Sequence, residues 1–177
     1  MPLQGGGTVL VAGLGFETNL RAKGPPAAYV FQTFDTDGVY TFERDGTGSY
    51  KGLNHMFTLP FTVPNPNAPP PTITVPSSAG SANITFLFHY TVTDDGKITV
   101  TADPGTYAAE WKYGPSAGKT YHFDGLVRTG LIMPDGKTIT LTSGAPNVMS
   151  VIAPFVDMPP TAQMIISSSM VLFYQHD

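Results

Sequence analysis

The feature that most constrains the fold is a stretch in which apolar and polar residues alternate on both sides of an Asp-Gly pair. In Ile84–Thr101, ITFLFHYTVTDDGKITVT, apolar side chains recur at every second position before the pair and again after it. A period of two is typical of a β-strand with one buried face. The stretch therefore predicts an antiparallel hairpin that turns at Asp95-Gly96.

The length of the loop decides which residues of this hairpin lie opposite each other. A two-residue loop would place Val92 opposite Thr99 and mix the two faces, because directly opposed residues share a face. A three-residue loop, Asp94-Asp95-Gly96, places Val92 opposite Ile98 and keeps one face apolar. We therefore predict the three-residue loop, in which Gly96 supplies the left-handed conformation at the last position.

A second Asp-Gly pair lies in the same kind of surroundings. A three-residue loop at Arg44-Asp45-Gly46 places Tyr40 opposite Tyr50. It also places Phe42 opposite Gly48, where the phenylalanine ring can cover the glycine.

A further Asp-Gly pair between two alternating segments leaves the register open. A three-residue loop at Pro134-Asp135-Gly136 sets Leu131 opposite Ile139 and is preferred. A two-residue loop sets Ile132 opposite Ile139 and is almost as good. Three hairpins of this kind in one chain predict a β-meander.

The composition supports a single all-β domain covering residues 1–177. The chain has 17 prolines and 19 glycines, and β-branched and aromatic residues dominate its middle, where helix formers are scarce. Closure of a twisted meander removes its exposed edges. We expect an antiparallel, mostly up-and-down β-barrel of about eight strands, sealed by pairing of the last strand with the first. A two-sheet β-sandwich is the alternative.

Several segments are expected to depart from this pattern. Residues 1–7 are interpreted as a loose leader, Glu17–Lys23 as a short helical turn, and Val148–Val156 as a strand or a helical turn. Residues 60–83 contain seven prolines between Pro60 and Pro76 and are interpreted as a Pro-rich excursion within the domain. Further strands are expected at Thr8–Phe16, Tyr29–Phe34, Gly38–Glu43, Thr47–Thr58, Thr72–Val75, Thr106–Tyr113, Thr120–Ile132, Lys137–Thr142 and Met164–Gln175.

Charge and cysteine content limit the partners. The net charge is −4 and the nine Lys and Arg residues are scattered, which argues against a nucleic-acid partner. The chain has no cysteine, so disulfides are excluded and the compartment stays open, either cytoplasmic or secreted with a signal removed. No run reaches the ~18 apolar residues of a membrane-spanning helix. Charged residues make up only 12% of the chain, which favours a homo-oligomer, a dimer or a trimer.

No cofactor or metal site is expected. The four histidines, His55, His89, His122 and His176, lie on separate segments without an H-x-H pair. The run Gly13-Leu14-Gly15 lacks the third glycine of a dinucleotide-binding fingerprint, because Thr18 stands in its place.

The strongest polar arrangement on a predicted strand is His122 with Asp124, which share a face, with Arg128 further along that face. A carboxylate beside a histidine can orient the imidazole as a general base, and Glu110 on the preceding strand could join the pair. The plainer interpretation is a polar outer face with an ordinary ion pair.

Aromatic residues on the predicted strands give a second candidate site. The inward faces could line a cavity for an apolar ligand, or the rings could simply fill the barrel. The strand Thr106–Tyr113 is expected to point its aromatic face inward, toward the central hairpin. The candidate ligand-binding residues are Phe86, Phe88, Tyr107, Trp111 and Tyr113.

Two phrases carry a resemblance to a known family. GVYTFERDGTG at 38–48 and FHYTVTDDG at 88–96 each join an aromatic strand to an Asp-Gly turn. This rhythm resembles bacterial calycin-like barrels, including those similar to the allene oxide cyclase barrel, and it covers about Tyr29–Thr142. The resemblance implies a small eight-stranded barrel with an apolar pocket, which can be oligomeric, and it carries no catalytic residue over to this chain.

The leading functional hypothesis is therefore the binding of a small hydrophobic molecule in an aromatic-lined barrel pocket. The first alternative is a cyclase or isomerase that encloses an apolar substrate and needs only one carboxylate or tyrosine to steer charge. Its candidate catalytic residues are Glu43, Glu110, His122 and Tyr90. The second alternative is a structural, self-assembling protein.

Overall fold

The computed structural model describes residues 7–21, 28–64, 72–143, 147–153, 163–167 and 169–175, with side chains described for 35–60, 62, 74 and 76–143. All regular secondary structure in these ranges is β-strand, and no helix there could cross a membrane. The strands are β1 (Gly7–Arg21), β2 (Ala28–Phe42), β3 (Thr47–Thr58), β4 (Phe61–Pro64), β5 (Thr72–Val75), β6 (Ser78–Val92), β7 (Lys97–Ala102), β8 (Tyr107–Tyr113), β9 (Thr120–Asp124), β10 (Val127–Ile132), β11 (Thr138–Thr142), β12 (Asn147–Ala153), β13 (Gln163–Ser167) and β14 (Ser169–Gln175).

Antiparallel pairing runs around the molecule as a closed ring. The long strands β1, β2, β3 and β6 lie side by side. The rest of the wall consists of four broken strands, β7 with β8, β9 with β10, β11 with β12, and β13 with β14. Since β6 pairs with both β7 and β8, and β1 with both β13 and β14, the ring closes and holds eight strands when each broken strand is counted once. The expectations of an up-and-down barrel and of a last strand paired with the first are confirmed.

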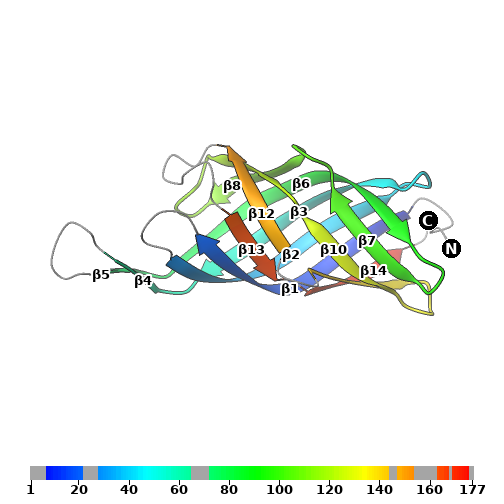
Figure 1. Ribbon diagram of the computed structural model, residues 1–177, viewed down its shortest axis with the longest axis horizontal. Coiled ribbons are helices and arrows are strands. Elements are labelled where there is room, and N and C mark those ends of the chain that lie inside the picture. Colours follow the sequence, from blue (N-terminus) through cyan, green and yellow to red (C-terminus); the bar gives the residue numbers. More distant parts are fainter. Residues whose placement is uncertain are drawn as a thin grey trace.

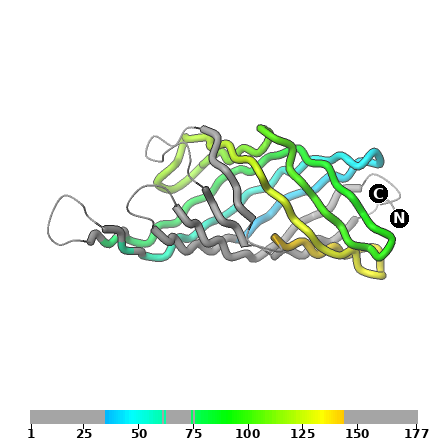
Figure 2. The backbone as a smooth tube through the Cα atoms, viewed as in Figure 1, coloured from blue at the N-terminus to red at the C-terminus, as the bar shows by residue number. Residues whose placement is uncertain are grey.

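The two ends of the barrel differ. The hairpin turns at 43–46, 93–96 and 133–137 lie at one end, here called the turn end, together with the start of β1 and the end of β14 (Figure 1). Residues 59–64, 72–77 and 114–118 lie at the other end, here called the far end, where the β4–β5 ribbon projects beyond the wall. The strands run obliquely to the long axis between these ends (Figure 2).

The register of the central hairpin is confirmed. Val92 lies opposite Ile98, and Gly96 has a φ of 79° and donates its N–H to the carbonyl of Thr93 at 2.9 Å. In the 43–46 hairpin Tyr40 lies opposite Tyr50, also as expected.

One detail of the 43–46 hairpin is wrong. Phe42 does lie opposite Gly48, but the ring that fills the space beside this glycine belongs to Phe88, its neighbour on β6. The ladders on both sides of β3 run past Gly48 and Gly52 without a register shift.

The preferred register of the third hairpin is wrong, and the alternative pairing is the one observed. Ile132 lies opposite Ile139, and four residues, 134–137, form the loop. Asp135 holds this loop by accepting the backbone N–H groups of Lys137 and Thr138 at 2.8 and 3.0 Å. The physical reason is the alternation of faces: Ile139 is buried, whereas Leu131 is 45% exposed on the outer face and cannot lie opposite it.

Some predicted boundaries also need correction. Glu17–Arg21 continue β1 as a strand, so the helical turn is wrong there, and Gly7 belongs to β1 rather than to a leader. Residues 28–42 form one strand where two were expected. The Pro-rich excursion contains the β4–β5 ribbon and the start of β6, which confirms Thr72–Val75 as a strand. Residues 1–6 and the rest of the proline run, 65–71, lie outside the described residues.

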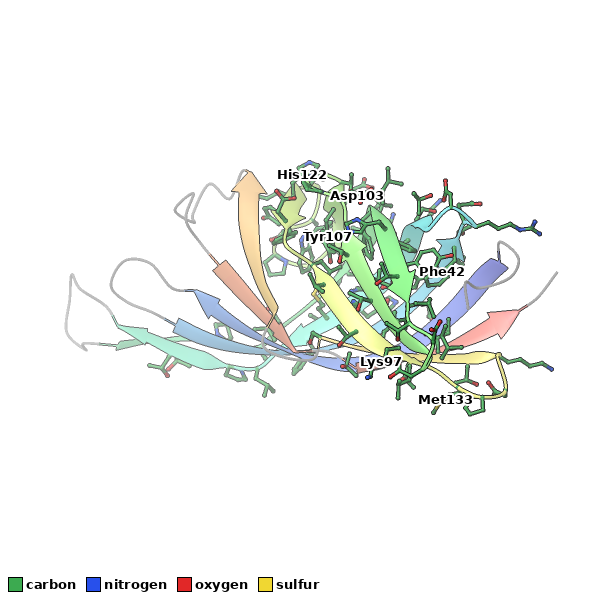
Figure 3. The ribbon with its side chains drawn as sticks, turned by 45° about the vertical axis from the view of Figure 1, so that its right-hand side comes forward. Phe42, Lys97, Asp103, Tyr107, His122 and Met133 are labelled. Atoms are coloured by element: carbon green, nitrogen blue, oxygen red, sulfur yellow. The ribbon has the colours of Figure 1, made fainter. Side chains whose placement is uncertain are left out.

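The core fills the barrel with rings on the turn-end side. In residues 35–42 of β2, and in β3 and β6, even-numbered residues point inward and odd-numbered residues point outward. Tyr40 packs on Tyr50 with ring centroids 4.6 Å apart, and Phe86 stacks on Tyr107 at 5.3 Å. Phe42 and Tyr107 lie between opposing strands, whereas His122 and Asp103 lie at the outer surface (Figure 3). We call Tyr40, Phe42, Tyr50, Phe86, Phe88, Tyr90 and Tyr107 the aromatic cluster.

Candidate functional site

Two of the four candidate catalytic residues meet at the turn end. The hydroxyl of Tyr90, a buried residue of β6, donates to the backbone carbonyl of Glu43 at 2.7 Å. The Glu43 side chain itself is exposed where β2 ends. This contact fastens the 43–46 turn to β6 and brings no carboxylate into the barrel.

The other two lie on the outer face of neighbouring strands. His122 of β9 lies opposite Ala108 of β8, and Glu110 lies two positions further along β8. The Glu110 carboxylate forms an ion pair with Lys112, and Asp124 accepts the backbone N–H of Gly105 at 2.6 Å. Glu110 and His122 are therefore near neighbours at the surface, remote from the Tyr90–Glu43 contact.

His89 is also at the surface, on the outer side of β6. Its Nδ1 lies 3.0 Å from Oδ1 of Asp103, at the break between β7 and β8. Thr106 donates to the Asp103 carbonyl at 2.8 Å and stabilises the same break.

Three of the five candidate ligand-binding residues, Phe86, Phe88 and Tyr107, are buried in the aromatic cluster. Trp111 is half-buried and packs against the core. Tyr113 is 66% exposed, so the expectation that it faces inward is wrong.

A register shift explains the exposure of Tyr113. Trp111 lies opposite Ala82, a buried position of β6, but Tyr113 lies opposite Ser81, which is on the outer face. Lys112 is the extra residue of this β-bulge. Because one inserted residue reverses the alternation of faces, Trp111 points inward and Tyr113 points outward.

A second change of face places an arginine inside the barrel, which sequence reasoning missed. Tyr121 and Phe123 point inward on β9, and the chain then breaks at Gly125, whose φ is 89°. After the break, Leu126 and Arg128 are the inward residues, and Arg128 is only 8% exposed. The prediction that Arg128 shares a face with His122 and Asp124 is therefore wrong. The apolar residues 121, 123 and 126 already show the change of phase in the sequence.

Polar side chains also point into the interior, and one of them, Tyr50, belongs to the aromatic cluster as well. Thr36 Oγ1 donates to Oδ1 of Asn54 at 2.6 Å, so the Tyr50 hydroxyl, 2.7 Å away, must be the donor to Thr36. We call Thr36, Tyr50, Asn54 and Arg128 the polar cluster. All four point inward, from three different elements of the wall: β2, β3 and β10.

The charge of Arg128 acts on the pKa values of two tyrosines in this region, Tyr40 and Tyr50. Burial raises the pKa of Tyr40 to about 12, and the charge of Arg128 opposes this rise. Burial also raises the pKa of Tyr50, while its hydrogen bond with Thr36 and the charge of Arg128 act in the opposite direction. Both hydroxyls are therefore neutral over the physiological range, next to a cationic guanidinium.

The interior differs in exposure along the axis. Near the turn end Phe42 and Ile98 are fully buried, whereas Val92 and Ile132 are partly buried. Toward the far end Asn54, Met56 and Trp111 also point inward but keep partial exposure. Among the described inward side chains, the rings of the aromatic cluster are therefore buried, whereas these three are in partial contact with solvent.

Glycines let two rings in this half lie against the wall. A Cβ at Gly38 would lie 2.7 Å from the Tyr50 hydroxyl, and Gly52 is in contact with the same ring. A Cβ at Gly80 would lie 2.5 Å from Cζ3 of Trp111. A ring that lies against a glycine of the wall occupies less of the space around the barrel axis than a ring that points across the interior.

The chemistry available to this interior is binding and charge stabilisation. Within the ranges whose side chains are described, no group of three or more His, Cys, Asp or Glu residues gathers to hold a metal ion. The polar cluster offers hydroxyl, amide and guanidinium groups, and among the described side chains the buried polar or charged ones are Thr36, Thr58, Arg128 and Ser143. Comparisons of the chain with known protein families, curated proteins and solved structures find no match.

Proposed function

We propose that this barrel binds a small hydrophobic molecule in the half of its interior nearer the far end. The observation that carries the proposal is the partial exposure of three inward side chains on the far-end side: Asn54, Met56 and Trp111 reach solvent, whereas the rings of the aromatic cluster are buried. An eight-stranded barrel is wide enough either to be filled by its side chains or to hold one small ligand. The resemblance to calycin-like barrels favours the second outcome.

The side chains at this position suit an apolar ligand. Trp111 and Phe123 offer aromatic contact area. Ala82 and Ala109, beside them, add only small side chains to the inner surface of the wall. Burial against such a surface stabilises binding by about 25 cal/mol per Å² of apolar area, before the cost of association is subtracted.

The test uses Trp111, the only tryptophan of the chain, as the reporter. We expect a blue-shifted emission in the free protein, because Trp111 is half-buried, and a saturable change on titration with decanol. Ala82→Leu, which adds volume opposite Trp111, should weaken decanol binding at least tenfold, whereas Ala79→Leu on the outer face of the same strand should not.

Two results would overturn the proposal. The first is an emission that does not respond to decanol or to a terpenoid alcohol, together with no retention of either compound in equilibrium dialysis. The second is equal binding by the Ala82→Leu and Ala79→Leu variants, both checked for folding by circular dichroism.

The enzyme alternative would need its groups inside the barrel. Glu43, Glu110 and His122 are at the outer surface, and the hydroxyl of Tyr90 is bonded to a backbone carbonyl. No specific observation favours the cyclase or isomerase over the binding protein, so we propose binding alone.

A further inference from the structure

We infer that the proline-rich segment 65–71 of one copy of this chain docks on an exposed aromatic face of a second copy, so that two copies exchange segments and form a dimer. The face lies on the outer surface toward the far end and consists of Phe57 of β3, Ala79 and Ser81 of β6, and Tyr113 of β8. We call it the far-end face. The inference concerns the outer surface and does not depend on ligand binding in the interior.

The far-end face has two exposed rings on either side of one strand. Phe57 lies opposite Ala79 on one side of β6, and Tyr113 lies opposite Ser81 on the other side. Phe57 is 43% exposed and Tyr113 is 66% exposed. Since neighbouring strands are about 4.8 Å apart, the two strands that carry the rings are separated by about 10 Å. The β6 residues between them have small side chains, so an extended peptide could lie on β6 between the rings.

The chemistry of the face suits a proline-rich peptide. Proline-rich segments bind as polyproline II helices between aromatic side chains. The hydroxyl groups of Tyr113 and Ser81 can donate hydrogen bonds to peptide carbonyls, and His55, opposite Ser81 on β3, adds an imidazole. The charged groups of β8 beside this face, Glu110 and Lys112, form an ion pair with each other.

The segment 65–71, NPNAPPP, has the complementary properties. Four of its seven residues are prolines, which have no N–H group and leave carbonyl oxygens as the main hydrogen-bonding groups of the backbone. It carries no charge, so it matches a face whose neighbouring charges are paired. It also joins β4 to β5 at the tip of the ribbon that projects beyond the wall (Figure 1).

The length of the segment decides that the contact is made between two copies. Because both of its ends are held at the tip of the ribbon, its middle reaches at most about 14 Å from Pro64. Phe57 precedes Pro64 by seven residues, or about 23 Å of strand, and the ribbon leads away from the wall. The segment therefore does not reach the far-end face of its own chain. Reciprocal exchange between two copies satisfies both faces and closes the assembly as a dimer.

The test measures the mass of the full chain by sedimentation equilibrium across a dilution series. We expect the native protein to change from one chain to two with rising concentration. Tyr113→Ala, and replacement of residues 65–71 by a Gly-Ser segment of the same length, should each raise the dimer dissociation constant about tenfold or more. Leu131→Ala removes an exposed apolar side chain outside the far-end face and should leave the constant unchanged.

Mixing the two variants tests the exchange itself. The Tyr113→Ala chain keeps the segment and the Gly-Ser chain keeps the face, so an equimolar mixture should associate more tightly than either variant alone. A fluorescein-labelled peptide with the sequence of residues 64–72, PNPNAPPPT, should bind the Gly-Ser chain saturably and bind Tyr113→Ala about tenfold or more weakly.

Three results would overturn the inference. The first is a native mass of one chain at every concentration. The second is dimerisation of the Gly-Ser chain with the native constant, which would assign the interface to a surface that does not use the segment. The third is an equal loss in Leu131→Ala and Tyr113→Ala. If Tyr113→Ala does not fold, as judged by circular dichroism, Phe57→Ala takes its place, and the Gly-Ser chain with the labelled peptide decides independently of both.

Discussion

Gly96 is the residue on which the central hairpin depends. Its φ of 79° is unfavourable for a β-branched side chain, and a Cβ there would lie 3.3 Å from the Ile132 carbonyl. We expect Gly96→Val to lower the free energy of unfolding by about 1–3 kcal/mol. Lys97→Ala removes an exposed ion pair with Asp95 and should lower the free energy of unfolding much less than Gly96→Val does. Urea unfolding measures both, and equal losses would contradict the three-residue loop.

Because the hydroxyl of Tyr40 is buried and its pKa is raised, we predict that the protein loses stability at alkaline pH. Its pKa is about 12 in the folded protein and 10.0 without burial, so between these values the unfolded chain has lost the proton that the folded chain keeps. The free energy of unfolding should therefore be constant below pH 10 with respect to this group. Above pH 10 it should fall by about 1.4 kcal/mol per pH unit.

Substitution isolates this contribution. Tyr40→Phe should make the fall of the unfolding free energy with pH shallower, by the slope that corresponds to about one proton released on unfolding. Urea unfolding between pH 9 and about 11.5 measures this slope. Tyr113→Phe, at an exposed position, is the matched control. An unchanged slope in Tyr40→Phe would contradict the burial of its hydroxyl.

At the residue scale, the sequence predicted the turns but missed the polar cluster. Gly96 could be assigned because a loop of that length needs a left-handed residue at one position, which glycine provides. Thr36 and Asn54 could not be paired, because they are brought together only by the β2–β3 register and are unremarkable in composition. Arg128 was missed because counting alternate positions from His122 assumes an unbroken strand, and Gly125 breaks it.

At the element scale, registers were predictable where both alternation and turn residues constrained them. The 43–46 and 93–96 hairpins have a single pairing that keeps one face apolar, and that pairing is observed. The Lys112 bulge was not predictable, because a bulge adds one residue without a distinctive composition. Asp-Gly is also ambiguous on its own: Asp37-Gly38 lies within β2, whereas Asp124-Gly125 ends β9.

A substitution at Gly80 tests how β8 packs on β6 at the far end. A Cβ at this position would meet both the Trp111 ring, at 2.5 Å, and the Tyr113 carbonyl, at 3.1 Å, so the ring must move. We expect Gly80→Ala to cost about 1–3 kcal/mol of unfolding free energy and to shift the Trp111 emission. Ser81→Ala, on the outer face beside it, is the control. An unchanged emission in Gly80→Ala would contradict the packing of Trp111 on this glycine.

At the scale of the whole molecule, oligomerisation stays a prediction. It follows from the low charge of the chain, 12%, and large apolar side chains are exposed at Phe57, Leu87 and Leu131. Light scattering across a dilution series should give a mass of two or three chains. A mass of one chain, 18.8 kDa, at every concentration would contradict it.

Closure of the barrel is the property of the whole molecule that can be tested most directly, because the chain has no cysteine of its own. Leu10 lies opposite Phe173 and Val11 opposite Leu172 on the β1–β14 ladder. We consider two double-cysteine variants, one with cysteines at 10 and 173 and one with cysteines at 11 and 172. Successive opposed pairs alternate between wide and narrow spacing, so one of these variants has the closer geometry for a disulfide. That variant should form an intramolecular crosslink on oxidation and raise the free energy of unfolding by about 3–5 kcal/mol, because the crosslink closes most of the chain into a loop. Cysteines at 10 and 172 would point to opposite faces of the sheet and should not crosslink. If this control crosslinks as readily as the opposed pairs, or if neither opposed pair does, then β1 and β14 do not close the barrel in this register.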